Sequence, residues 1–161
     1  GCANLRLATV MADVLADRGT NALVVRGSDG LDEVTIFADT EVWDATRGGA
    51  VHLDSIRLAA TGVSEGQASE LKGGTAELNA KIARDMFGGA TEGPLRAVRD
   101  AVVLNTAAAL VAWDAANGIH SDEDITARVI AAMPRAAEAI DSGAVLRLLD
   151  RWAAVSSEAA R

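Results

Sequence analysis

The sequence predicts an α/β fold in which a partial parallel or mixed sheet is followed by several alanine-rich helices. Residues 4–18 have helical spacing, and the apolar run Ala22–Val25 that follows is typical of a strand covered on both faces. From Thr75 onward the pattern is helical. Half of the 161 residues are apolar, mostly as Ala, Val and Leu, and small side chains favour closely packed helices.

The first helix is indicated by apolar residues on one stripe, namely Leu7, Val10, Met11, Val14 and Leu15. Gly19 then suits the position after the helix end. A helix followed directly by a buried strand is the second half of a β-α-β crossover. Only residues 1–3 precede this helix, too few for a paired strand. We therefore expect the chain to begin within a larger α/β domain, completed by a longer polypeptide or by another chain.

Three β-like segments follow this strand, over residues 34–37, 40–44 and 50–56, with a turn at Gly48-Gly49 between the last two. Residues 60–74 are polar and glycine-rich and predict a loop. The middle of the chain is therefore expected to complete the sheet before the helices begin.

Four helices are predicted in the second half. Thr75 caps the first, which lasts to Phe87, and a long apolar helix covers residues 95–116. Ser121 is expected to cap a third helix, and Ser142-Gly143 separates it from the last. The inner face of the third helix is predicted to carry Ile125, Val129, Met133, Ala136 and Ile140.

The charge and cysteine content restrict the partners. The net charge of −8 opposes binding to nucleic acid or to an anionic membrane, because both are negative. A single cysteine, Cys2, allows no intramolecular disulfide, so we expect a reducing, cytoplasmic compartment. The longest apolar run, residues 101–113, is too short to span a bilayer.

The strongest chemical signal is the adjacent pair Asp32 and Glu33, which follows the strand Ala22–Val25. In open α/β sheets, ligands bind outside the carboxyl ends of the strands. Gly27 and Gly30 allow a sharp turn there and leave room for a ligand. One or two carboxylates together with substrate phosphates suit Mg²⁺. The pair is either a magnesium site or a solvated surface turn, and the pattern alone favours the turn.

Other polar residues favour structural roles. Arg26 and Lys72 could attract phosphate, but isolated surface cations seldom do. Arg96 is expected to pair with Asp100 one helical turn later. Asn105, in an apolar helix, must be hydrogen-bonded if buried, and a link to a loop backbone is the favoured partner. No zinc spacing, nucleophile elbow or glycine-rich phosphate loop is present, so we assign no catalytic residue.

Four blocks in order resemble anthranilate phosphoribosyltransferase: ALVVRGSDGLDEVT, LKGGTAELNAKIARDMFGG, GPLRAVRDAVVLNTAAALVA and AAEAIDSGAVLRLLDRW. The opening GCANLRLATVMADVLADRG resembles the helix before the family's GLDE strand. The resemblance covers nearly the whole chain but only the carboxyl-terminal half of the family. It implies that residues 1–161 are the carboxyl-terminal part of a phosphoribosyltransferase domain of the nucleoside phosphorylase-like fold.

The resemblance also implies a function. The family transfers phosphoribose from phosphoribosyl pyrophosphate to anthranilate in tryptophan biosynthesis. Its GLDE motif aligns with residues 30–33, which makes Asp32 and Glu33 the Mg²⁺ ligands. Its phosphate loop of the type GTGGD, its anthranilate contacts and its dimer-forming amino-terminal helical domain have no counterpart in this chain. The full enzyme is expected to be a homodimer, and the chain alone to be inactive.

The chain departs from the family at two positions, with Arg26 where the family commonly has His and Thr75 where it has Asp. Two alternatives stay open. A pyrimidine nucleoside phosphorylase-like enzyme would use phosphate and nucleosides without the acidic metal pair. A non-catalytic module would keep the fold and tolerate the loss of both carboxylates.

Overall fold

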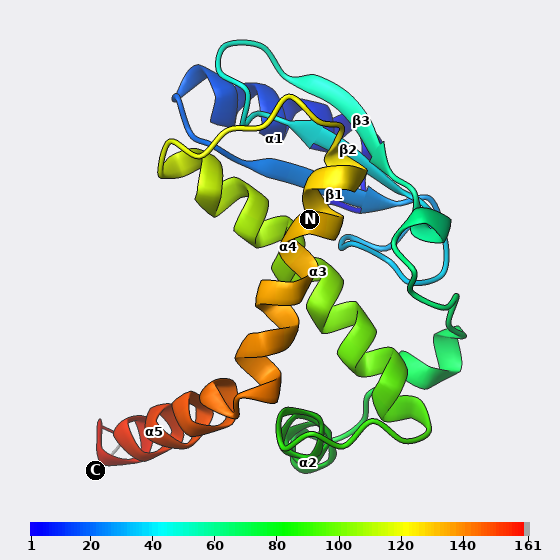
Figure 1. Cartoon of the computed structure of the whole chain (residues 1–161), viewed down its shortest axis with the longest axis vertical. Coiled ribbons are helices and arrows are strands. Elements are labelled where there is room, and N and C mark those ends of the chain that lie inside the picture. The colour runs from blue at the N-terminus through cyan, green and yellow to red at the C-terminus, as the bar shows by residue number, and fades with distance from the viewer. Residues whose placement is uncertain (160–161) are drawn as a thin grey trace.

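The computed structural model describes residues 1–159, and a three-stranded sheet lies toward one end of the molecule, opposite α2 (Ala76–Phe87) and α5 (Ala144–Ala159) (Figure 1). The strands are β1 (Leu23–Gly27), β2 (Thr40–Asp44) and β3 (His52–Ile56), in the order β1-β2-β3. Both pairings are antiparallel, and the register places Val24 opposite Trp43. The α/β class is confirmed. The strand pairs within residues 1–159 are antiparallel, whereas a parallel component was expected.

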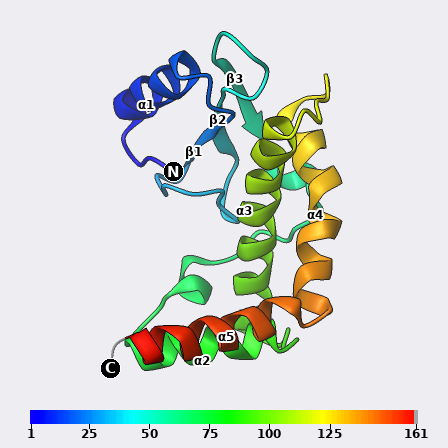
Figure 2. The ribbon, with the colours of Figure 1, turned by 90° about the vertical axis from the view of Figure 1, so that its left-hand side faces the viewer.

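Helices cover both faces of this sheet (Figure 2). Helix α1 (Leu5–Asp17) lies on one face, and α3 (Pro94–Ala116) and α4 (Ile125–Asp141) lie on the other. Side chains alternate between the faces along β1, because Val24 packs in the α1 cluster and Val25 in the cluster with α3 and α4. This confirms that β1 is covered on both sides.

The apolar stripe that indicated α1 does not face the sheet, apart from Leu15. Ala8 and Ala12 are fully buried against the sheet, and Leu15 is half-buried beside them. Exposed fractions of 42–56% are found for the large apolar residues Leu5, Leu7, Val10, Met11 and Val14. The small alanine side chains let the helix approach Val24 and Trp43 closely. The pattern identified the helix but not the face that meets the sheet.

The segment over residues 34–37 is not a strand, contrary to the prediction. Val34, Thr35 and Ile36 are buried, which explains their apolar pattern. Backbone N–H groups in this segment bond to side chains instead of a neighbouring strand. The Thr35 N–H donates to the Thr40 hydroxyl, and the Phe37 N–H donates to the Thr35 hydroxyl.

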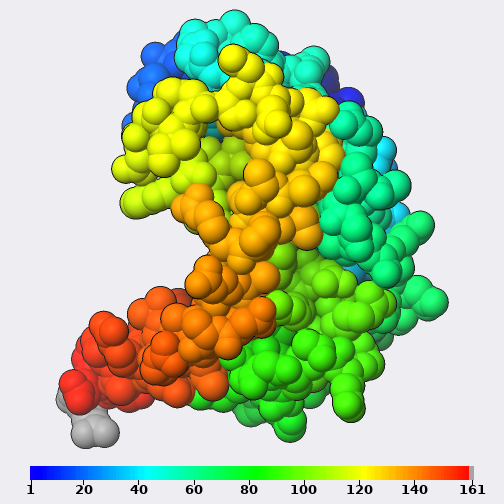
Figure 3. All heavy atoms as spheres, in the orientation of Figure 1, coloured from blue at the N-terminus to red at the C-terminus, as the bar shows by residue number. Residues whose placement is uncertain are grey.

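The remaining helices extend the molecule. Helix α2 (Ala76–Phe87) and α5 (Ala144–Ala159) lie side by side at one end, joined by a salt bridge between Arg84 and Asp150. α5 projects from the body of the protein (Figure 3). Short 3-10 turns occupy residues 58–60 and 68–71. Within residues 1–159, no helix is both long and apolar enough to cross a membrane.

Helix α4 begins later than predicted. Its N-terminal cap is Asp124, whose carboxylate accepts a hydrogen bond from the Ala127 N–H, and not Ser121. Pro134 lies inside this helix. Its predicted inner face is confirmed by the buried residues Ile125, Val129, Ala136 and Ile140, while Met133 is partly buried.

Candidate functional site

The loop that carries Asp32 and Glu33 leaves β1 through a tight turn. The Gly30 N–H donates to the Gly27 carbonyl at 2.8 Å, and the Gly27 N–H donates to the Leu31 carbonyl at 2.8 Å. Gly30 has a φ of +100°, a conformation that residues with a side chain rarely adopt. The glycine pair therefore fixes the start of the loop, as the sequence indicated.

A hydrogen bond between the side chains of Asp29 and Thr35 links the two ends of the loop. The Thr35 hydroxyl donates to the Asp29 carboxylate at 2.7 Å, and the same carboxylate accepts the Leu31 N–H at 3.1 Å. Asp29 was not singled out from the sequence. Its position, two residues before Leu31 in a glycine turn, is typical of an Asx turn and could have indicated this role.

Asn105 of α3 holds the end of the loop. Its side-chain oxygen accepts the Val34 N–H at 2.9 Å, and its amide nitrogen donates to the Val34 carbonyl at 2.8 Å and to the Ala101 carbonyl at 2.9 Å. The prediction that Asn105 links the helix to a loop backbone is confirmed. The structure adds that this loop is the one with the acidic pair.

Asp32 and Glu33 are both exposed on this loop. Across residues 1–159, neither carboxylate takes part in a hydrogen bond or a salt bridge. Nor do three or more His, Cys, Asp or Glu side chains gather anywhere in the described chain to hold a metal ion. The pair therefore fits Mg²⁺ or a similar divalent cation as one or two protein carboxylates, with water and, when bound, substrate phosphates supplying the other ligands.

Arg26 does not face the acidic pair. Its guanidinium forms a salt bridge with Glu41 on β2 at 2.9 Å and donates to the backbone carbonyls of Ala3 and Gly27. The guanidinium of Arg26 is therefore occupied by contacts with the sheet and with the first residues of the chain. The expectation that it is structural agrees with these contacts.

Lys72 lies on a cavity of about 400 Å³ that Glu33 also lines. Asn79 lines the same cavity and holds the adjacent loop, because its side chain accepts the Gly74 N–H at 2.9 Å. The floor is apolar and includes Met86 and Phe87 of α2. The fold therefore brings a cation and a candidate metal ligand to one hollow, although they are 39 residues apart in the sequence.

A second polar cluster, which was not predicted from the sequence, is buried between β2 and α4. Asp44 is fully buried and accepts hydrogen bonds from Arg128 at 2.7 Å and from the Thr46 N–H and hydroxyl. Burial of Asp44 opposes ionisation, but the bonds from Thr46 and the charge of Arg128 outweigh it, so the pKa lies below its ordinary value. The cluster ties α4 to the sheet.

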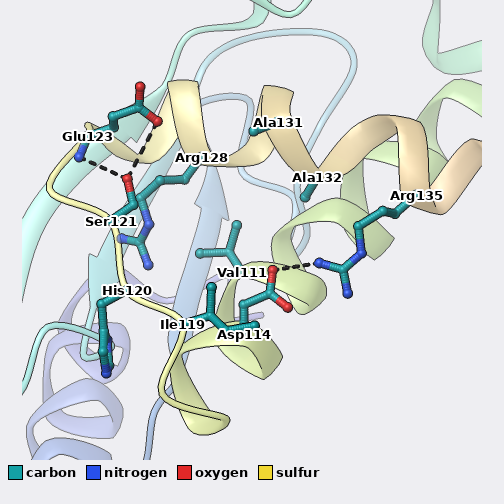
Figure 4. A pocket seen from close by; sticks show the side chains of 10 residues that line it. All are labelled: Val111, Asp114, Ile119, His120, Ser121, Glu123, Arg128, Ala131, Ala132 and Arg135. Atoms are coloured by element: carbon teal, nitrogen blue, oxygen red, sulfur yellow. Dashed lines mark hydrogen bonds and ion pairs between the residues drawn. The ribbon is translucent and has the colours of Figure 1, made fainter.

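A smaller hollow beside this cluster contains His120 (Figure 4). The figure shows Arg135 directed at Asp114, with which it forms a salt bridge at 2.6 Å, and Glu123 beside Ser121. Arg128 also lines it but is bound to Asp44. Since these arginines are already paired with carboxylates, the hollow supplies no free cation to act with the imidazole.

Two arginines of α3 form salt bridges on the surface of the protein. Arg96 forms a salt bridge with Asp100 at 3.3 Å, as the spacing predicted, and Arg99 forms one with Asp141 at 3.0 Å. Neither cation lies on the acidic loop. The first salt bridge lies within α3, and the second joins α3 to the end of α4.

Comparison with known proteins assigns a family. The model of a glycosyl transferase family, a/b domain, matches residues 1–146. The chain belongs to this glycosyl transferase family. The match includes the acidic loop, the cavity beside it and the whole sheet. The α5 helix lies mostly beyond the matched residues.

Relatives within this glycosyl transferase family are longer than the chain. An anthranilate phosphoribosyltransferase of Nocardia farcinica is 46% identical over 158 residues, which cover 98% of this chain and 44% of the relative. The solved enzyme of that name from Thermus thermophilus is 28% identical, with a TM-score of 0.71 over 94% of this chain and 40% of its own. A Saccharomyces cerevisiae structure in complex with PRPP and Mg shares the fold, with 24% identity and a TM-score of 0.74. The chain spans less than half the length of these relatives.

Proposed function

We propose that this chain is part of an anthranilate phosphoribosyltransferase, which transfers phosphoribose from phosphoribosyl pyrophosphate to anthranilate and releases pyrophosphate. The observation that carries the proposal is the acidic pair, two exposed and unpaired carboxylates on a loop anchored at both ends. The relatives and their names support it. The full protein is proposed to be a cytoplasmic enzyme of tryptophan biosynthesis and a homodimer.

In this reaction the bond from the sugar carbon to pyrophosphate breaks, a bond from that carbon to the anthranilate nitrogen forms, and the amine loses one proton to the released pyrophosphate or to water. Bound Mg²⁺ would neutralise and orient the leaving pyrophosphate. Asp32 and Glu33 are the residues proposed to hold it. No covalent protein nucleophile is needed, because positioning and charge stabilisation suffice for such a transfer.

We propose that the chain supplies the carboxyl-terminal portion of the enzyme. It is proposed to be active only together with a counterpart of the remaining portion that its longer relatives contain. Its described cavity offers a glutamate of the acidic pair and one lysine but no glycine-rich phosphate loop. The outward face of α1 supports this proposal, because contiguous exposed apolar surface commonly marks an interface. Val10 and Val14 on that face are 56% and 51% exposed.

The direct test is a chimera in which this chain replaces the aligned 158 residues of the Nocardia farcinica relative. We expect the chimera to consume anthranilate in the presence of phosphoribosyl pyrophosphate and Mg²⁺, while the isolated chain does not. Anthranilate fluorescence measures the loss of substrate. Turnover of thymidine with phosphate instead of anthranilate would favour a nucleoside phosphorylase, and turnover by the isolated chain would contradict the proposed dependence on the remaining part.

A further inference from the structure

We propose that Asn105 is a positioning residue for the acidic pair, so that divalent-cation binding at Asp32 and Glu33 depends on its side-chain amide. This inference rests on the proposed function, because that proposal makes the pair a metal site. Asn105 lies on α3, 72 residues beyond Glu33 in the sequence, and it is not itself offered as a ligand.

Both polar atoms of the Asn105 amide form hydrogen bonds. Its oxygen accepts the Val34 N–H, and its nitrogen donates to the carbonyls of Val34 and Ala101. Ala101 is one turn earlier on the same helix, so this bond holds the Asn105 side chain in one orientation. The two remaining bonds join that fixed side chain to both backbone groups of a single loop residue.

Val34 lies directly after Glu33 in the chain. The Val34 N–H belongs to the same planar peptide unit as the Glu33 carbonyl. Holding the Val34 N–H in place therefore fixes the orientation of the peptide plane that joins Glu33 to Val34. On the other side of the pair, the Leu31 carbonyl is held by the Gly27 N–H at 2.8 Å. The two acidic residues are thus bracketed by one bond before them and two after them.

The backbone conformation of the loop decides where the two carboxylates point. Successive side chains on an extended strand point to opposite faces, so two adjacent carboxylates reach one cation only when the backbone is held in another conformation. Residues 31–36 form no strand in this structure. The side-chain amide of Asn105 takes the place of a neighbouring strand as the hydrogen-bond partner of Val34. It thereby keeps the loop in its non-strand conformation.

The experiment uses the 161-residue chain, isotopically labelled with nitrogen-15, and Mn²⁺ as a paramagnetic probe. In the unaltered chain we expect Mn²⁺ to broaden the backbone amide signals of Asp32 and Glu33 first. Asn105→Leu should raise the Mn²⁺ concentration for half-broadening roughly 10- to 100-fold, the range found when groups that orient metal ligands are removed. It should also speed hydrogen exchange of the Val34 amide.

Two further variants separate positioning from general loss of stability. Val129→Ala removes buried volume from α4, far from the loop in sequence, and should leave the Mn²⁺ midpoint unchanged. Asn105→Gln keeps a polar amide on a longer stem, so it can be measured if the leucine variant does not fold, and it should weaken binding in the same direction.

The outcomes are distinct. Weaker Mn²⁺ binding in the Asn105 variants, with Val129→Ala unchanged, supports the inference. Equal binding in all variants, or equal weakening by Asn105→Gln and Val129→Ala, overturns the role of Asn105 and leaves the proposed metal site standing. If the unaltered chain shows no broadening at Asp32 and Glu33, the metal assignment and this inference both fail.

Discussion

At the scale of single residues, the buried pair Asp44–Arg128 joins β2 to α4. Both side chains are almost fully buried, at 0% and 7% exposure. Asp44→Asn leaves the guanidinium of Arg128 without a counter-charge, and losing one partner of a buried pair costs about 3–5 kcal/mol. We expect that loss in urea unfolding at pH 7. The exposed control Asp17→Asn should change stability by less than about 0.5 kcal/mol.

The pH dependence of stability follows from the same carboxylate. The pKa of Asp44 is lowered from 3.8 in the folded protein, so the ionised form stabilises the fold. That contribution is present above pH 3.8 and disappears as the pH falls through the folded pKa. Thermal unfolding should therefore show a steeper loss of stability below about pH 4 in the unaltered protein than in Asp44→Asn. Parallel curves for the two proteins would contradict this assignment.

At the scale of secondary-structure elements, the start of α2 tests a departure from the family. The Thr75 hydroxyl accepts the Leu78 N–H at 3.3 Å and caps the helix. Thr75→Ala should cost about 0.5–2 kcal/mol. Thr75→Asp, the residue that the resemblance implies at this position, should retain the cap and stabilise the helix N-terminus by its charge. Urea unfolding of both variants measures this, and equal losses would show that Thr75 does not cap.

The sequence predicted those elements whose own residues decide their structure. The inner face of α4 followed from Ile125, Val129 and Ile140, because large side chains are used there for packing. The face of α1 did not, because Ala8 and Ala12 make the contact and alanine is a weak signal. Residues 34–37 were mistaken for a strand, since their burial imitates one while side chains such as Asn105 supply the hydrogen bonds.

The candidate site, like the fold, was predictable only where the residues of one segment decide its structure. Asp32 and Glu33 were singled out as candidates by their position after a buried strand, and only the resemblance implied a metal-binding role. The support by Asn105, and the placement of Lys72 on the cavity of Glu33, depend on contacts between distant parts of the chain. Spacing along one sequence cannot indicate such contacts, and the buried ion pair between β2 and α4 was missed for the same reason.

At the scale of the whole molecule, the chain resembles one part of a larger enzyme. The match to the Nocardia farcinica relative covers 98% of this chain but 44% of the relative. The described sheet has an edge at β1, where the Cys2 N–H donates to the Val25 carbonyl at 3.0 Å. A sheet edge and an exposed apolar helix face are features that commonly mark interfaces.

The central claim is that the acidic pair binds the Mg²⁺ of a phosphoribosyl transfer, and the Mg²⁺ dependence of the chimera tests it most directly. The measurement is anthranilate turnover against Mg²⁺ concentration for the chimera and for its Asp32→Ala, Glu33→Ala and Asp17→Ala variants. We predict that both acidic-pair variants lose Mg²⁺-dependent turnover, while Asp17→Ala keeps it. Full turnover of both Asp32→Ala and Glu33→Ala at the Mg²⁺ concentration that the unaltered chimera needs would contradict the claim.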